Sequence, residues 1–208
     1  MTPERPYQPE FEPKHPKLVW VSHIDFVFKH LHFDVVEDLG VIEGSLDNLA
    51  PSSILLGLQG KLKGKTFFTE DEESNMIEAQ KIAKEIYKHH KPEGVHRFGK
   101  DRSWLPMAVV LEVTEEGTDV DVMVENLVMV DIRRIKKALD VPELKDVTYK
   151  INPTGAWDES YRFSEAKIPA FSLCLPIHGE LHSLRSWVEI GKIDKFRRAI
   201  LAIDKHFG

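Results

Sequence analysis

The sequence predicts an α/β fold: a three-layer sandwich whose mixed, largely parallel central sheet is flanked by helices. Three observations support this prediction. Short apolar runs alternate with amphipathic segments along the 208 residues, which is typical of strands joined by helices. Several runs are apolar throughout, so their strands need cover on both faces of the sheet. The composition, 42% hydrophobic and 30% charged, is ordinary for one globular domain.

The first segment differs in composition from the rest. Residues 1–16 hold five of the 12 prolines, and proline fixes φ and removes a backbone donor. We therefore expect a proline-rich extended arm over residues 1–16, which could support a homo-oligomer by lying on a neighbouring subunit. Residues 17–208 are expected to form a single domain.

The first strand and helix follow this arm. Residues 18–21 are apolar and rich in β-branched and aromatic side chains, which predicts a buried strand that ends at His23. Residues 49–62 place Ile54, Leu55, Leu58 and Leu62 on one helical face. We expect a helix there, beginning directly after Asp47.

The later elements repeat the pattern. Residues 66–69 predict a strand, residues 70–73 an acidic turn and residues 76–87 a helix. Residues 107–111 predict a strand that stops at Glu112, and residues 169–175 predict one that stops before a loop over 176–182. Residues 188–207 close the pattern as an amphipathic helix.

Charge and cysteine content exclude several classes of protein. The formal net charge is −6, whereas a nucleic-acid binder carries a basic face. Cys174 is the single cysteine, so a disulfide scaffold is excluded. We find no signal-peptide h-region and no apolar run of the roughly 20 residues that a membrane span needs, and we expect a cytoplasmic protein without a nucleic-acid or membrane partner.

Polar residues stand where the predicted strands end, which is where ligands bind in such sheets. His23 and Asp25 form His-x-Asp, in which the aspartate can orient the imidazole toward a metal; the alternative is a structural histidine. Asp47 precedes a helix and could instead be its N-cap. Glu72 and Glu73 follow a strand and could simply be solvated.

Two further sites complete the pattern. Glu112 ends an apolar run, where a carboxylate is costly unless it is paired or metal-bound. The loop after the strand at 169–175 offers His178 and His182, and the local spacing does not choose between them. Carboxylates mixed with imidazoles suit zinc, with cobalt or manganese as substitutes. Taken together, these residues predict a metal centre at the strand ends.

The ordered motifs resemble those of the co-catalytic dinuclear zinc peptidases, the group that contains leucyl aminopeptidases, tetrahedral aminopeptidases and aminoacylases. The resemblance covers residues 18–207. It rests on five local matches: Ser22-His-Ile-Asp25, Glu43-Gly-Ser-Leu-Asp-Asn48, Phe68-Thr-Glu-Asp-Glu-Glu73, Val110-Leu-Glu-Val-Thr114 and Leu181-His-Ser183. A sixth match, Gly155-Ala-Trp-Asp158, is looser, and Asp158 is not assigned a catalytic role.

The resemblance implies a metal-dependent peptidase, most simply an aminopeptidase, with two zinc ions. It selects His182 over His178. One ion would be held by His23, Glu112 and a bridging Asp47, and the other by Asp47, Glu73 and His182. Asp25 would orient His23, and Glu72 would act as general base toward a peptide or an acyl-amide substrate.

This sequence also departs from the group. Only 23 residues separate His23 from Asp47, so we expect the catalytic domain alone, without the lid domain that some members insert. The bulky residues from Phe26 to Phe28 follow the His-x-Asp motif and could obstruct the site. The alternatives are therefore an amidohydrolase, deacylase or carboxypeptidase with the same metals, and a catalytically silent binding protein.

Overall fold

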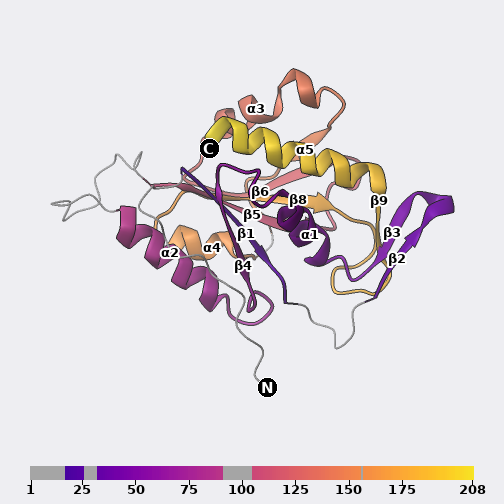
Figure 1. The fold of residues 1–208 in the computed structure, drawn as a ribbon, viewed down its shortest axis with the longest axis horizontal. Helices are drawn as coiled ribbons and strands as arrows, with labels where there is room; N and C mark the ends of the chain where they lie inside the picture. Colours follow the sequence, from indigo (N-terminus) through magenta and orange to yellow (C-terminus); the bar gives the residue numbers. More distant parts are fainter. Residues whose placement is uncertain (1–16, 26–31, 91–104, 156) are drawn as a thin grey trace.

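The computed structural model describes residues 17–25, 32–90, 105–155 and 157–208. Its main sheet has six strands in the order β4-β1-β5-β8-β6-β7 (Figure 1). These strands are β1 Leu18–His23, β4 Lys65–Thr69, β5 Met107–Thr114, β6 Val122–Val128, β7 Tyr149–Ile151 and β8 Ala170–Pro176. The first four strands in this order, β4, β1, β5 and β8, are mutually parallel. Strand β6 runs antiparallel to β8 and parallel to β7. The predicted mixed, largely parallel sheet is confirmed.

Helices cover both faces of this sheet, as predicted. One face packs against α1 Leu49–Leu58, α3 Ile132–Leu139 and α5 Ile190–Phe207. The other face packs against α2 Ile77–His90 and α4 Ser160–Glu165. Because alternate residues of a strand point to opposite faces, Trp20 packs toward α5 and Val21 toward α2. Each apolar strand therefore contributes to two separate core layers.

A second, three-stranded sheet was not predicted. It has the order β2-β3-β9, with β2 Phe33–Val36, β3 Val41–Gly44 and β9 Ser186–Glu189, and the short 3₁₀ helix η1 Glu37–Leu39 joins β2 to β3. The hairpin of β2 and β3 projects from one side of the molecule (Figure 1). The predicted last helix is confirmed over Ile190–Phe207, but its start was placed two residues too early, because Val188 pairs with Ile42 in this sheet.

Three element boundaries also differ from the prediction. Helix α1 ends at Leu58 instead of residue 62, because Gly60 has a left-handed φ of 80°. Strand β5 continues through Glu112 to Thr114, since its pairing with β8 extends to Pro176. Helix α2 runs on to His90. The arm over residues 1–16 and the segment over residues 26–28 lie outside the described residues, so the predictions for them stay open.

A buried carboxylate joins the last helix to the first strand. Asp204 of α5 accepts hydrogen bonds from Trp20 Nε1 of β1 at 3.0 Å and from the backbone N–H groups of Lys63 and Gly64 at 2.8 and 2.9 Å. A side chain on Gly64 would lie 2.7 Å from the Trp20 ring. The close approach of these segments therefore requires a glycine at that position.

A second carboxylate, Asp121, joins β6 to the segment before β7 and to α5, and we predict that its removal destabilises the fold. It accepts bonds from the backbone and hydroxyl of Thr148, both at 2.8 Å, and from Lys195 Nζ at 3.0 Å. Asp121→Ala is expected to cost about 1–3 kcal/mol, because Thr148 and Lys195 lose the acceptor that joins their segments to β6. Urea denaturation measures this loss.

The loss should depend on pH. Burial opposes ionisation of Asp121, but its bonds from Thr148 and Lys195 hold the pKa below its ordinary value. Its contribution is therefore complete above the unfolded pKa of about 4 and disappears as the pH falls through the lower folded value. Asp119→Asn, at an exposed ion pair with Lys150, is the matched control. Equal losses for both variants at neutral pH would contradict the prediction.

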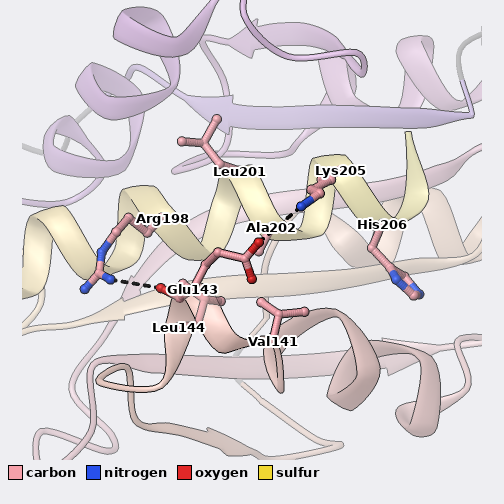
Figure 2. Close-up of a pocket in the computed structure, with 8 residues that line it drawn as sticks. All are labelled: Val141, Glu143, Leu144, Arg198, Leu201, Ala202, Lys205 and His206. Carbon is pink, nitrogen blue, oxygen red and sulfur yellow. Dashed lines mark hydrogen bonds and ion pairs between the residues drawn. The ribbon is translucent and has the colours of Figure 1, made fainter.

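A pocket of about 380 Å³ lies between α5 and the 3₁₀ helix η2 Pro142–Leu144 (Figure 2). Leu201 and Val141 line it, and Glu143 bonds Lys205 at its rim. This pocket shares no lining residue with the predicted metal centre. Within the described ranges, no helix combines the length and apolar character needed to cross a membrane.

Candidate metal centre

The predicted ligands come from five separate segments and meet at one edge of the main sheet. His23 is the last residue of β1, and Glu112 lies near the end of β5. Glu73 lies in the turn after β4, Asp47 lies between β3 and α1, and His182 lies in the loop after β8. Strands β1, β4, β5 and β8 are parallel, so their carboxyl ends reach the same edge.

One group of potential ligands surrounds His23. Its Nε2 atom lies 3.3 Å from Asp47 Oδ1 and 3.4 Å from Glu112 Oε2. The histidine side chain is almost fully buried, with 1% exposed. One nitrogen and two carboxylate oxygens therefore converge in the sheet edge, within reach of a single cation.

A second group surrounds His182. Its Nε2 atom lies 3.2 Å from Asp47 Oδ2 and 3.2 Å from Glu73 Oε2. Asp47 thus presents one oxygen to each histidine. Asp47 is not the N-cap of α1, because Asn48 occupies that position. The side chain of Asn48 makes no capping hydrogen bond. Asp47 is therefore common to both groups of potential ligands.

Asp25 fixes the orientation of His23. The other ring nitrogen, Nδ1, lies 3.2 Å from Asp25 Oδ1. The backbone N–H groups of Glu72 and Glu73 donate to the two oxygens of Asp25 at 3.3 and 3.1 Å. When Nδ1 carries the proton, Nε2 presents its lone pair to the carboxylates of the centre. Asp25 therefore links the histidine to the acidic turn.

The electrostatics of the site show uncompensated negative charge. Burial opposes protonation of His23, but Glu112, Asp25 and Asp47 raise its pKa far above the ordinary value. Burial raises the pKa of Glu112 and the nearby His23 lowers it, and the net result is a rise to about 7. Burial, then Glu112, raises the pKa of Glu72 to about 9. Glu72 and Glu112 thus lie where nearby positive charge would favour their ionisation.

The donor set fits divalent cations. Glu73 Oε1 and Glu112 Oε1 are buried and have no hydrogen-bond partner, and a buried acceptor without a partner is costly. Two groups of three donors, each including Asp47 and one histidine, have their atoms within 4.8 Å of one another. A third group combines His23 with Glu72 and Glu73. Glu72 therefore lies close enough to be either a base or an additional ligand.

His178 and the loose Gly-x-x-Asp match occupy other positions. His178 stacks on Trp187 with ring centroids 3.9 Å apart and lies 3.3 Å from Glu189, away from the acidic groups. Asp158 is buried near the centre and accepts hydrogen bonds from Asn126 and Ser160. Its satisfied carboxylate agrees with leaving it without a catalytic role.

A cavity of about 600 Å³ lies against the centre and contains residues that the sequence reasoning missed. Besides the predicted residues, it is lined by Glu125 of β6, by Trp157 and by Arg162 of α4. The looser match around Gly155 was the one signal for Trp157. Glu125 had none, because no strand was predicted over residues 122–128.

Comparison with known proteins identifies the fold. No protein-family model matches the sequence, and no curated protein matches it. Three solved structures that match are the TET1 peptidase of Pyrococcus horikoshii (18% identity, TM-score 0.58), a TET aminopeptidase of a marine-sediment thaumarchaeon (15%, 0.61) and an aminopeptidase of Thermotoga maritima (12%, 0.60). The alignments cover 86%, 84% and 84% of this chain.

The alignments cover only part of the three solved chains. The aligned region covers 53%, 52% and 48% of those three chains, so this chain spans about half the length of each. At these identities the likeness shows the fold. The similarity in fold to aminopeptidases is confirmed, and the chain has the fold of these aminopeptidases over about half of their length.

Proposed function

We propose that this protein is a metal-dependent hydrolase that cleaves peptide bonds, acting as an aminopeptidase with a dinuclear zinc centre. The observation that carries the proposal is the shared carboxylate of Asp47, which presents one oxygen to His23 and the other to His182. The fold of known aminopeptidases supports it.

Each ion would have three protein ligands. His23, Glu112 and Asp47 would hold one, and Asp47, Glu73 and His182 would hold the other, which agrees with the two donor groups. Two divalent cations at these positions would supply Lewis acidity toward the substrate carbonyl and lower the pKa of water. The half-exposed His182 leaves one side of the centre open to the cavity.

Glu72 is the proposed general base. Its Oε2 atom lies 4.0 Å from His23 Nε2, and it lines the cavity beside the ligands. A carboxylate in this place can take a proton from the attacking water and return it to the leaving nitrogen. Asp25 contributes by holding both His23 and the backbone of the turn that carries Glu72.

The proposal is tested by metal content and hydrolysis together. Protein purified without chelator is expected to contain about two zinc, cobalt or manganese ions per chain. Dialysis against a chelator should abolish cleavage of aminoacyl anilides, and zinc should restore it. A panel of aminoacyl anilides, N-acyl amino acids and carboxy-terminal amides assigns the bond that is cleaved.

The outcomes separate the competing functions. Preference for free amino termini supports an aminopeptidase, and preference for N-acyl substrates would instead make the protein a deacylase with the same centre. Full activity after complete metal removal would refute the metal-dependent proposal. Bound metal without hydrolysis of any substrate in the panel would leave a binding protein on this fold.

Assembly and location extend the same proposal. The TET1 peptidase of Pyrococcus horikoshii can assemble into a tetrahedron or an octahedral shell. We include homo-oligomerisation of this chain, through residues 1–16, and a cytoplasmic location in the proposal. We also propose residues 17–208 as one catalytic domain. Sedimentation of the full chain and of a variant without residues 1–16 tests the role of the arm.

A further inference from the structure

The cavity beside the candidate metal centre has more carboxyl groups than the centre uses. Six of the described residues that line it carry one: Asp47, Glu72, Glu73, Glu112, Glu125 and Asp158. The first four are the proposed ligands and base. Asp158 has its own donors, namely Asn126 Nδ2 at 2.8 Å, the Ser160 N–H at 2.8 Å, and the hydroxyls of Ser160 and Ser172. Glu125 is the carboxylate that remains.

Glu125 is buried, with 4% of its surface exposed, and it lies at the cavity wall on β6. It receives a hydrogen bond from the Thr114 hydroxyl at the long distance of 3.5 Å and a weak one from the Cys174 thiol. Within the described part of the chain, no Lys, Arg or His forms an ion pair with it. Burial, then Glu116 and Asp158, raises its pKa to about 7.

The surrounding chain makes space for this carboxylate. A side chain on Gly155 would begin 2.6 Å from Glu125 Oε2, so only a glycine allows the two segments to pack this closely. A buried carboxylate that lacks a counter-charge is costly. A cavity of about 600 Å³ that such a carboxylate lines is suited to a ligand that brings the positive charge.

The other walls suit a long, apolar stem. Trp157 lines the cavity with 61% of its surface exposed and is supported by Tyr161, whose ring centroid lies 4.0 Å away. Met76 and Leu181 add apolar surface. Among the described lining residues, Arg162 is the one Lys or Arg. Its two terminal nitrogens donate to Glu165 and to the carbonyl of Asn75, and its buried Nε has no hydrogen-bond partner.

The distance between Glu125 and the centre distinguishes two cationic groups of an aminopeptidase substrate. Strand β8 lies between β5, which carries Glu112, and β6, which carries Glu125. Glu112 pairs with Cys174 of β8 and Glu125 with Ser172, so two strand spacings and an offset of two residues separate their backbones by roughly 11–12 Å. The α-amine is attached to the carbon next to the scissile carbonyl and stays near the metals. The four-carbon stem of lysine, or the guanidinium stem of arginine, can reach across.

We propose that Glu125 binds the cationic end of a lysyl or arginyl side chain at the amino terminus of the substrate, with Trp157 packing on its stem. This inference rests on the proposed aminopeptidase function, because it takes the scissile carbonyl to lie at the metal centre. The substrate class is then peptides with a basic first residue. A cation between an aromatic face and a carboxylate combines a cation–π contact with a charge-assisted hydrogen bond.

The test compares lysyl and norleucyl p-nitroanilide, whose side chains differ by the terminal ammonium. For the zinc-loaded full chain, kcat/KM should be higher for the lysyl substrate. Glu125→Gln should reduce the lysyl-to-norleucyl ratio by about 10- to 100-fold, the usual value of a hydrogen bond to a charged group. Glu116→Gln, which removes a nearby exposed charge that does not line the cavity, should leave the ratio close to that of wild type.

A ratio near one in wild type, or a ratio that Glu125→Gln does not change, would overturn the inference while leaving the aminopeptidase intact. If neither anilide is hydrolysed, the proposed function has failed. The pocket is then tested by calorimetry with free L-lysine and L-norleucine. Tighter binding of lysine that Glu125→Gln abolishes supports the cation site, and equal affinities, or no binding of either amino acid, overturn it.

Discussion

Glu72→Gln is expected to lower kcat for an aminoacyl anilide by about 10²–10⁴-fold, the usual contribution of general acid–base catalysis. Glutamine keeps the size of the side chain but cannot accept a proton at neutral pH. The proposed ligands are untouched, so metal content by plasma mass spectrometry should stay at the wild-type value. The combination of retained metal with lost turnover is the signature of a base.

The alternative for Glu72 gives a different result. His23, Glu72 and Glu73 also form a group of potential ligands, and a ligand role predicts that Glu72→Gln loses metal in parallel with activity. Glu70→Gln is the matched control, because it removes an exposed charge from the same turn. Its activity is expected to match that of wild type. Unchanged turnover in Glu72→Gln would remove Glu72 from the mechanism.

Asp47→Ala is expected to reduce bound metal from about two ions per chain to fewer than one. The substitution removes an oxygen from each histidine group at once, since Asp47 Oδ1 faces His23 and Oδ2 faces His182. Hydrolysis should fall to the background rate. The thermal midpoint gives a second measurement: zinc should raise it for wild type, because ligands that bind the folded state stabilise it, and should not raise it for the variant.

Asp38→Ala, at an exposed aspartate of η1, controls for the loss of one negative charge and should retain both ions. The decisive comparison is between the two metals within Asp47→Ala. If one ion binds as tightly as in wild type and the other is lost, Asp47 belongs to a single site. The two histidine groups would then function independently, and the dinuclear proposal would be wrong.

The fold could be predicted where local sequence reports burial. The strand at Leu18–His23 and the helix at Ile77–His90 have apolar periods that one element satisfies alone. Strand β8 was predicted for the same reason. The apolar residues of each element define the face that becomes buried, so the element can be predicted without knowing which other elements pack against it.

The missed elements depend on partners that are distant in sequence. Strands β6 and β7 lie beyond β8 at the edge of the sheet and run antiparallel to it. Their positions depend on pairing with other strands, which the spacing of apolar residues along the chain does not encode. The small sheet is similar: β9 takes its extended form from pairing with β3, more than a hundred residues earlier in the chain. Val188 was therefore assigned to the following helix, whose apolar pattern it happens to continue.

The site shows the same division. His23, Asp47, Glu73, Glu112 and His182 were named from strand ends and ordered motifs, and the structure brings them together. Their roles remain proposals. Glu125 could not be found in this way, because its importance comes from its burial at the cavity wall and from the lack of an ion pair to it among the described residues. Neither property is visible in a string of residues.

The anchoring of α5 to β1 through Asp204 and Trp20 has a consequence for biosynthesis. The first strand is held in part by a side chain near the end of the final helix, and β8, which lies between β5 and β6, is also made late. A nascent chain on the ribosome therefore cannot close its sheet until most of its residues have been translated. Completion of the sheet is therefore expected to be largely post-translational.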